Sequence, residues 1–241
     1  GLGGSKVTAI ITVTAVNDAP SFTKGSNITL IEDNGTFTQY NWATNLDKGA
    51  SNESSQNLTF NVSNDNSTLF NTQPAINTSG KLTFSTLSNQ HGFATVTVGL
   101  SDDGGTAFGG ANTYPDQTFT ITVTPIADTP SITTASTLED SITISGLIIS
   151  RNPVDGTEVT HFKITSITDG SLYKNDGTTL IASNEYITFA EGNAGLKFDP
   201  DADFFGSASF KVQASTSASG GISGLGGSKV TAIITVTAVN D

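Results

Sequence analysis

The sequence predicts an all-β protein built from two tandem Greek-key β-sandwiches, and three observations support this. Residues 1–18 reappear letter for letter as residues 224–241, so we expect the chain to come from an array with a 223-residue repeat. Inside this unit, Asp18, Asp128 and Asp241 each follow an alternating segment and are spaced by 110 and 113 residues. Each interval holds roughly seven short alternating segments, as β-sandwich domains do.

The spacing of these aspartates sets the expected domain boundaries. We expect residues 1–18 to be the last strand and linker of a preceding repeat, residues 19–128 to form a first module and residues 129–241 a second. Each module has a usual size for one domain with its own core. Repetition favours a spacer or a multivalent binder, because a catalytic site is needed only once.

Strands are expected wherever apolar and polar residues alternate. In the leading segment and first module these runs are residues 6–16, 58–63, 81–86, 94–100 and 117–126. In the second module they are residues 141–149, 161–167, 186–190, 195–198 and 207–215. The runs are rich in Thr, Val, Ile and Phe, which suit pleated, half-buried surfaces. Turn signals such as Asn34-Gly35 and Asp155-Gly156 separate them, and no run has helical periodicity.

Aromatic side chains are expected to fill two cores. The candidates for the first core are Phe22, Trp42, Phe60, Phe84, Phe93 and Phe119. The candidates for the second core are Phe162, Phe189, Phe198, Phe204 and Phe210.

The composition of the chain limits the kinds of partner that we expect it to bind. The net charge of −12 divides evenly between the two modules, and no basic patch is visible. We therefore expect no nucleic-acid partner and no direct insertion into a membrane, since the phosphates of both would repel this surface. The chain has no Cys, so core burial or a metal ion, rather than disulfides, must stabilise the modules.

Carboxylates gather near the expected ends of the strands. They comprise linker aspartates, a Glu-Asp pair after the first strand of each module, and two loop clusters. The candidates are Asp18, Glu32, Asp33, Asp102, Asp103, Asp128, Glu139, Asp140, Asp199, Asp201, Asp203 and Asp241. Alternate loops of a sandwich lie at the same end. We therefore expect Glu139, Asp140 and the loop holding residues 199–203 to meet near Asp241, and Asp102 and Asp103 to meet the loop with Asp47 and Glu53.

Crowded carboxylates need a counter-charge, and no Lys or Arg cluster supplies it. Calcium takes several carboxylate and carbonyl oxygens in flexible geometry, so the pattern favours Ca²⁺. Zinc and copper are not expected, because Cys is absent and His91 and His161 are isolated. The competing interpretation is that the loops are acidic and solvated.

Several motifs resemble those of one family. VNDAP (16–20), SDDGG (101–105), DPDADFFGSASFKV (199–212) and the two Glu-Asp pairs are similar to cadherin-like or VCBS-type tandem repeats of large bacterial RTX-type surface adhesins. The resemblance covers essentially the whole chain. It implies immunoglobulin-like sandwiches joined end to end, calcium at the junctions and secretion to the cell surface. By this resemblance, the linker ligands are Asp18, Asp128 and Asp241, the first-strand ligands are Glu32 and Glu139, and the loop ligands are Asp102 and Asp103.

Two departures from that pattern concern the inner junction. The second module has STSASGG (215–221) where the first has SDDGG, and the first has Ser88-Asn89-Gln90 where the second has Asp201-Ala202-Asp203. We therefore expect fewer or looser ions around Asp128 than at the junction between repeat units.

The sequence thus predicts a calcium-stiffened extender of a giant bacterial cell-surface adhesin, which projects distal ligand-binding domains for adhesion and biofilm formation. Its expected partners are neighbouring repeats of the same chain, and it is expected to be extracellular and monomeric. The alternative is a repeated glycan- or protein-binding module acting by avidity. A cluster of tyrosines on one face, drawn from Tyr40, Tyr114, Tyr173 and Tyr186, would favour it. An enzyme is not expected, because the acids lie in loops and neither His has a nucleophile partner.

Overall fold

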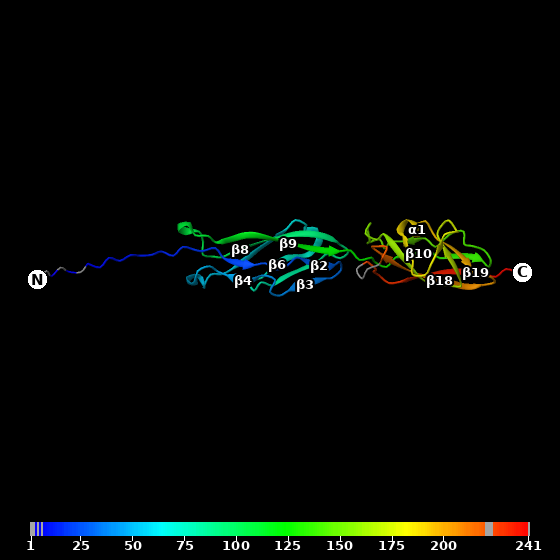
Figure 1. The fold of residues 1–241 in the computed structure, drawn as a ribbon, viewed down its shortest axis with the longest axis horizontal. Coiled ribbons are helices and arrows are strands. Elements are labelled where there is room, and N and C mark those ends of the chain that lie inside the picture. Colours follow the sequence, from blue (N-terminus) through cyan, green and yellow to red (C-terminus); the bar gives the residue numbers. More distant parts are fainter. Residues whose placement is uncertain (1–2, 4, 6, 220–223, 241) are drawn as a thin grey trace. The chain divides into compact units, whose positions relative to one another are not determined.

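The computed structural model describes residues 3, 5, 7–219 and 224–240 and confirms an all-β fold with two β-sandwich domains (Figure 1). By compactness, one unit comprises residues 1–28, 36–85 and 93–121, and the other comprises residues 29–35, 86–92 and 122–241. We call the sheets of residues 21–124 the N-terminal sandwich and the sheets of residues 131–237 the C-terminal sandwich.

The N-terminal sandwich contains the first nine strands. They are β1 (Ser21–Thr23), β2 (Ile28–Ile31), β3 (Thr36–Gln39), β4 (Thr44–Asp47), β5 (Thr59–Asn64), β6 (Phe70–Ile76), β7 (Leu82–Thr86), β8 (Gly92–Ser101) and β9 (Thr113–Thr124). Short 3-10 helices cover Ser51–Glu53, Ser67–Leu69 and Ala107–Gly109. The strands form sheets with the orders β2-β9-β8-β5 and β3-β7-β6 and a β1-β4 pair.

The C-terminal sandwich contains the remaining strands and one helix. They are β10 (Ser131–Ile132), β11 (Ala135–Leu138), β12 (Ile149–Ser150), β13 (His161–Thr168), β14 (Gly170–Tyr173), β15 (Leu180–Ile181), β16 (Tyr186–Thr188), α1 (Phe189–Asn193), β17 (Lys197–Pro200), β18 (Gly206–Ser215) and β19 (Val230–Thr237). The sheet orders are β11-β19-β18-β13-β16 and β15-β14-β17, with a β10-β12 pair.

The large sheets of the two sandwiches have corresponding strand orders. The order β2-β9-β8-β5 in one matches β11-β19-β18-β13 in the other. In both, the last strand lies between an early strand and the strand that precedes it in the sequence. The two sandwiches are therefore copies of one topology, as the weak 110-residue repeat predicts.

The aromatic cores are confirmed with one exception. Trp42, Phe84, Phe162 and Phe210 are buried, but Phe93 was predicted wrongly, since its side chain is 65% exposed. It precedes the buried Ala94 on β8, so the alternation of the strand turns Phe93 outward. Of the other candidates, Phe60, Phe189 and Phe204 are only half-buried.

The predicted strand at residues 186–190 is interrupted by a short helix. Thr188 Oγ1 accepts a hydrogen bond from the Glu191 backbone N–H at 3.2 Å, and the Glu191 carboxylate accepts one from the Thr188 N–H at 2.7 Å. This reciprocal capping box ends β16 and begins α1. Of the helices in the described ranges, none has the length and apolar character needed to cross a membrane.

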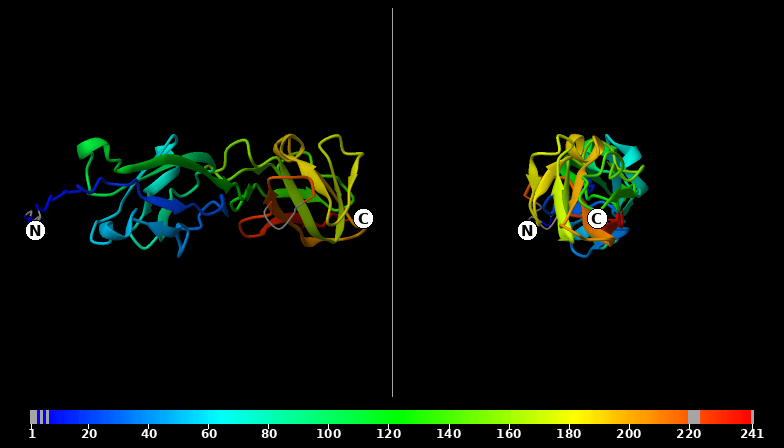
Figure 2. Two further views of the ribbon diagram at one scale, coloured as in Figure 1. Left: turned by 60° about the vertical axis from the view of Figure 1, so that its left-hand side comes forward. Right: turned by 90° about the vertical axis from the view of Figure 1, so that its right-hand side faces the viewer.

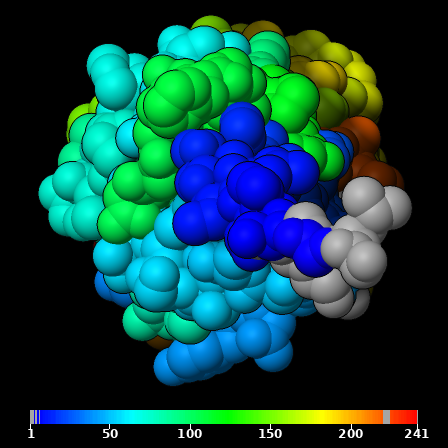
Figure 3. All heavy atoms as spheres, turned by 90° about the vertical axis from the view of Figure 1, so that its left-hand side faces the viewer, coloured from blue at the N-terminus to red at the C-terminus, as the bar shows by residue number. Residues whose placement is uncertain are grey.

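The two copies of the repeated segment have different structures. We call residues 1–18 the N-terminal copy and residues 224–241 the C-terminal copy. The C-terminal copy supplies β19, whereas residues 7–18 form no strand and extend ahead of β1 (Figure 2). Ile11 is 86% exposed and its counterpart Ile234 is 0% exposed. In Figure 3, which views the molecule from this side, the blue spheres of the segment stand in front of the rest of the molecule. Sheet partners, rather than local sequence, therefore decide whether these residues form a strand.

Candidate functional site

A buried glutamate follows the first strand of each large sheet and binds the backbone of the segment that leaves the sandwich. Glu32 is 4% exposed, and its carboxylate accepts a hydrogen bond from the Ile126 N–H at 2.7 Å. Glu139 is 5% exposed, and its carboxylate accepts one from the Val239 N–H at 2.6 Å. The two predicted first-strand acids thus occupy equivalent positions and make the same contact.

The aspartate after each of these glutamates caps a neighbouring loop. Asp33 accepts a hydrogen bond from the Asn89 N–H at 2.9 Å, and Asp140 accepts one from the Asp203 N–H at 3.3 Å. Asp33 and Asp140 have φ values of 58° and 56°, in the left-handed region that aspartate tolerates better than most residues. The predicted meeting of Asp140 with the loop after β17 is therefore present.

One member of that acidic run is not in the loop. Asp199 lies within β17, opposite Ser171 of β14, and is half-buried. Asp201 and Asp203 follow the strand and are exposed. The prediction that residues 199–203 form one loop was therefore wrong for Asp199, because the alternating pattern that ends at Phe198 continues into the ladder with β14.

At the other end of the N-terminal sandwich, two buried acids bind Asn17 and Asp18, the last two residues of the N-terminal copy. The Asp18 N–H donates to Glu53 at 2.9 Å, and the Asn17 side-chain amide donates to Asp102 at 2.9 Å. The Gln56 side-chain amide in turn donates to the side-chain oxygen Oδ1 of Asn17 at 2.6 Å. Glu53 and Asp102 are only 4% and 7% exposed. Of the four acids expected to meet here, Asp102 and Glu53 contact the linker, whereas Asp47 accepts a hydrogen bond from the Gly49 N–H and Asp103 accepts hydrogen bonds from Asn57.

Two oxygens of this cluster have no hydrogen-bond donor among the described residues. They are Asp102 Oδ2 and Gln56 Oε1, and both are buried. Gln56 also lines a hollow of about 190 Å³ together with Asn17, Glu53 and Gly104. Buried acceptors without donors are rare in proteins, and a hard cation would satisfy them.

The SDDGG motif is explained by neighbours of this cluster. Asp103 accepts hydrogen bonds from the Asn57 backbone and side-chain N–H groups, both at 2.8 Å, and these bonds lower the pKa of Asp103. A Cβ atom on Gly104 would collide with the side-chain amides of Asn17 and Gln56. Asp103 therefore fixes the loop, while Gly104 leaves room for the linker side chain.

The inner linker residues are held in a similar way with different side chains. The Asp128 N–H donates to Asp155 Oδ1 at 3.1 Å, as Asp18 does to Glu53. Burial raises the pKa values of Asp128, Asp155 and Glu32. The position of Asn17 is taken here by Ala127, which is 1% exposed and belongs to the apolar core of the C-terminal sandwich.

These acids accept hydrogen bonds from backbone and side-chain N–H groups of the linkers and loops. Among the described residues, no three acidic or histidine side chains form a group that could hold a metal ion. Within the same residues, Glu32, Glu53, Asp102 and Glu139 form no ion pair with Lys or Arg. Asp241 lies outside the described residues.

The amides of Asn17 and Gln56 were not predicted as site residues. Asn17 stands inside the VNDAP motif, which marks its position, whereas no signal in the sequence distinguishes Gln56 from other loop residues.

Comparison with known proteins gives likeness of structure only. No protein-family model matches the sequence, and no curated protein matches it. Among solved structures, chicken VE-cadherin EC1-2 is similar at 16% identity and a TM-score of 0.34, over 89% of this chain and 98% of that one. Human protocadherin-24 EC1-2 is similar at 12% identity and a TM-score of 0.42, over 90% and 98%. Because these identities and scores are low, the role of the chain must be argued from its own residues.

Proposed function

We propose that this chain is a calcium-stiffened structural extender from a large adhesin of the bacterial cell surface, and that it has no catalytic role. The observation that carries the proposal is that buried or half-buried carboxylates repeatedly bind the backbone of linker residues. Glu32 and Glu139 bind the residues that leave each sandwich, while Glu53 and Asp155 bind the residues that enter it. A set of contacts that recurs at each linker is expected of a spacer, whereas an active site would be expected only once.

Calcium fits the donor set at the N-terminal copy. Asp102 Oδ2 and Gln56 Oε1 are buried acceptors without donors, and the exposed side chain of Asp18 lies next in the chain to Asn17. Carboxylate and amide oxygens are the ligands that Ca²⁺ prefers, and no soft ligand is present. When bound there, the ion would neutralise the acids and tie the linker to the loops after β4 and β8.

The other predicted ligands form comparable sets with fewer free atoms. At the inner linker, Glu32, Asp128 and Asp155 are acids whose pKa values burial raises, so each would gain from a nearby cation. At the exit of the C-terminal sandwich, Glu139 and the Asp140–Asp203 contact supply oxygens beside the segment that ends in Asp241.

The alternative, a glycan- or protein-binding module, has weaker support. Only Tyr40 of the four tyrosines is strongly exposed, at 73%. Tyr114 packs on Phe22 with ring centroids 5.6 Å apart, and Tyr173 and Tyr186 lie on strands of different sheets. The four tyrosines therefore do not form an aromatic platform of the kind that sugars stack on.

Thermal melts of the whole chain test the calcium proposal. With millimolar Ca²⁺ against excess chelator, we expect a reversible rise in melting temperature that Mg²⁺ does not reproduce. At a hundred times Kd, one site stabilises by about 2.7 kcal/mol. For a domain of this size, that is a shift of roughly 10–20 °C.

Two matched variants assign the effect to the cluster. Asp102→Asn should reduce the calcium shift, because it replaces the carboxylate that has a free oxygen. Asp116→Asn removes the same charge from an exposed position on β9 and should leave the shift unchanged. Equal melts with calcium and chelator would show that the acids are solvated loop residues and would refute calcium stiffening.

A further inference from the structure

Asn34 is the only asparagine of the sequence that a glycine follows, and Asn34 and Gly35 lie in an exposed turn. The turn comprises residues 32–35 and joins β2 of one sheet of the N-terminal sandwich to β3 of another. We propose that Asn34-Gly35 is a site of spontaneous modification, at which the side-chain amide is lost and the backbone is rearranged. The substrate is the chain itself, and water is the only co-reactant.

The reaction follows from the chemistry of a side-chain amide next to an unhindered backbone nitrogen. The Gly35 nitrogen attacks Asn34 Cγ, and the bond from Cγ to the side-chain nitrogen breaks. That nitrogen leaves as ammonia with the proton of the Gly35 N–H, and a five-membered succinimide ring remains. Water then adds to one of the two ring carbonyls and opens the ring. Opening on one side gives aspartate, whereas opening on the other gives isoaspartate, in which the main chain runs through the former side chain. No electrons are transferred, so neither an oxidant nor a reductant is needed.

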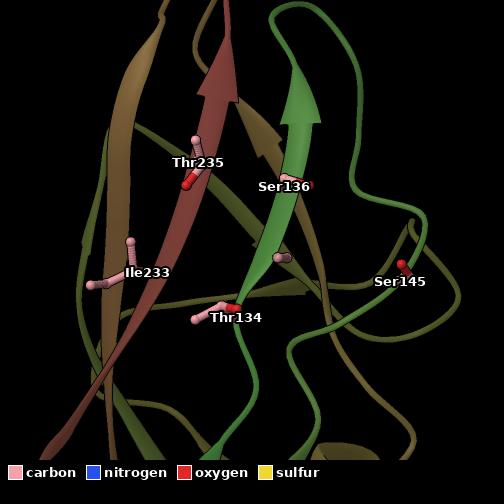
Figure 4. Close-up of a pocket in the computed structure, with 6 residues that line it drawn as sticks. Thr134, Ser136, Ser145, Ile233 and Thr235 are labelled. Carbon is pink, nitrogen blue, oxygen red and sulfur yellow. The ribbon is translucent and has the colours of Figure 1, made fainter.

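The conformation of the turn requires the glycine that makes the reaction possible. Gly35 has a φ of 71°, in the left-handed region where other side chains are strained. A Cβ atom on Gly35 would meet no atom within 4 Å, so the space beside its backbone is open. Ser145-Gly146 is a packed turn for comparison, because a Cβ atom on Gly146 would lie 2.5 Å from the Thr134 carbonyl oxygen. Figure 4 shows Thr134 and Ser145, which line the hollow beside that packed turn.

The two reacting groups are free to approach each other. Among the residues that the structure describes, no hydrogen bond involves the Asn34 side chain or the Gly35 N–H. By contrast, the side-chain amide of Asn57 donates to Asp103 at 2.8 Å. A free amide can rotate toward the next backbone nitrogen, whereas a bound amide must first break its hydrogen bonds.

The Asp-Gly pairs of the chain are less reactive for chemical and structural reasons. An ionised carboxylate is a poorer electrophile than an amide. At Asp103-Gly104, Asp155-Gly156 and Asp176-Gly177, the carboxylate also accepts hydrogen bonds from other residues. At Asp169-Gly170, the glycine lies in the ladder between β14 and β17. We therefore expect Asn34-Gly35 to react first.

The modification changes a turn that positions two acids. Either product adds a carboxylate to a chain whose net charge is already −12. Isoaspartate also lengthens the main chain by one carbon, about 1.5 Å, within a short connection between two sheets. That connection carries Glu32, which binds the Ile126 N–H at 2.7 Å, and Asp33, which binds the Asn89 N–H at 2.9 Å. We therefore expect isoaspartate to weaken both contacts. This inference is independent of the proposed calcium sites, because it concerns only the chemistry of Asn34 and Gly35.

Mass spectrometry of aged protein tests the reaction. Trypsin cuts after Lys24 and Lys48, so one peptide of residues 25–48 holds the reactive pair. After the folded chain is incubated at mildly alkaline pH, we expect this peptide to gain the mass difference between an OH and an NH₂ group, with the change located at Asn34 by fragmentation. Asn34→Gln is the matched control, because its longer side chain would have to close a larger ring, and its peptide should stay unchanged.

A synthetic peptide of residues 25–48 separates the chemistry from the fold. The proposal is overturned if this peptide is modified under the same conditions while the folded chain is not, because the native turn then protects Asn34. It is equally overturned if the folded chain is modified at other asparagines but not at Asn34.

Urea unfolding, followed by Trp42 fluorescence, tests the consequence for the turn. The isoaspartate form, enriched by ageing and anion-exchange chromatography, should unfold at a urea concentration lower by roughly 1 M, since two hydrogen bonds are weakened. Asn34→Asp adds the same charge to a main chain of normal length and should keep the wild-type midpoint. Equal midpoints for the isoaspartate form and Asn34→Asp would overturn the predicted weakening.

Discussion

The same substitution at two identical sequence positions, Ile11 and Ile234, should change the free energy of unfolding by very different amounts. Ile11 and Ile234 have the same neighbours for several residues on either side, yet their exposed fractions are 86% and 0%. We predict that Ile234→Ala destabilises the C-terminal sandwich by about 2–5 kcal/mol, the usual cost of removing a fully buried Ile side chain. Ile11→Ala should change the free energy of unfolding by less than about 0.5 kcal/mol, as substitutions of exposed residues do.

Urea unfolding measures both effects. With a slope of about 2 kcal/mol per molar urea, the Ile234→Ala transition should move down by roughly 1–2.5 M. Far-UV circular dichroism follows both sandwiches. Fluorescence of Trp42, the only Trp and 1% exposed, follows the N-terminal sandwich and should not change.

Equal costs for the two substitutions would refute the reasoning. They would mean that residues 7–16 are packed as firmly as β19, so that the exposed apolar face is covered in solution. A negligible cost for Ile234→Ala would instead show that β19 does not fill the core between β11 and β18.

Three further predictions concern other parts of the fold. Thr188→Ala removes the cap of α1 and should cost roughly 1 kcal/mol in urea unfolding of the C-terminal sandwich, whereas no change would mean that the capping box is not formed. Asp176 accepts hydrogen bonds from Thr179, which lower its pKa to about 2. Because this pKa is depressed, wild type should be more stable than Asp176→Asn above about pH 4, and this difference in stability should disappear as the pH falls through 2. A difference that persists at pH 2 would contradict this. Gly104→Ala drives a methyl group into the Asn17 and Gln56 amides and should lower the stability of the N-terminal sandwich by about 1–3 kcal/mol, read from Trp42 fluorescence in urea, and an unchanged midpoint would argue against that packing.

The alternation of apolar and polar residues predicted strands well where the strand lies between two regular neighbouring strands. The predicted run at residues 207–215 is β18 within one residue, and the run at 161–167 is β13. The run at 141–149 was wrong, since only Ile149–Ser150 forms a strand there. Gly146 has a φ of +90°. Within this run, only Thr143 hydrogen-bonds to the Phe198 backbone, and its N–H donates to the Phe198 carbonyl at 2.8 Å. An alternating pattern thus marks which side chains are buried, but it does not guarantee a continuous ladder.

The sequence identified several acidic residues of the candidate site, but it did not show which groups they bind. Local motifs located Glu32, Glu139 and Asp102, because a carboxylate next to a strand end stands out in sequence. Sequence could not show that each binds a linker N–H, since these contacts join residues 94, 100 and 85 positions apart. It also missed Gln56, whose role depends on the position of the Asn17 side chain.

In the array that we propose, the two copies together would describe one complete linker. The C-terminal copy shows how the start of VND is held, because the Val239 N–H donates to Glu139. The N-terminal copy shows how its end is held, because Asn17 binds Asp102 and the Asp18 N–H binds Glu53. Since Val239 corresponds to Val16, one three-residue linker would be bound by buried acids on both sides.

The inner linker has the same backbone contacts but lacks the middle one. Ile126 binds Glu32 and Asp128 binds Asp155, yet Ala127 stands where the repeated linker has Asn. The side chain of Ala127 offers no oxygen ligand and is instead buried in an apolar core. This difference gives a physical reason for the expectation that ions are fewer or looser around Asp128. It also predicts that Ala127→Asn destabilises the chain, because a buried amide without a partner costs about 1–3 kcal/mol. Urea unfolding of the C-terminal sandwich measures that cost, and a neutral effect would show that the inner linker can accept the ligand set of the repeated one.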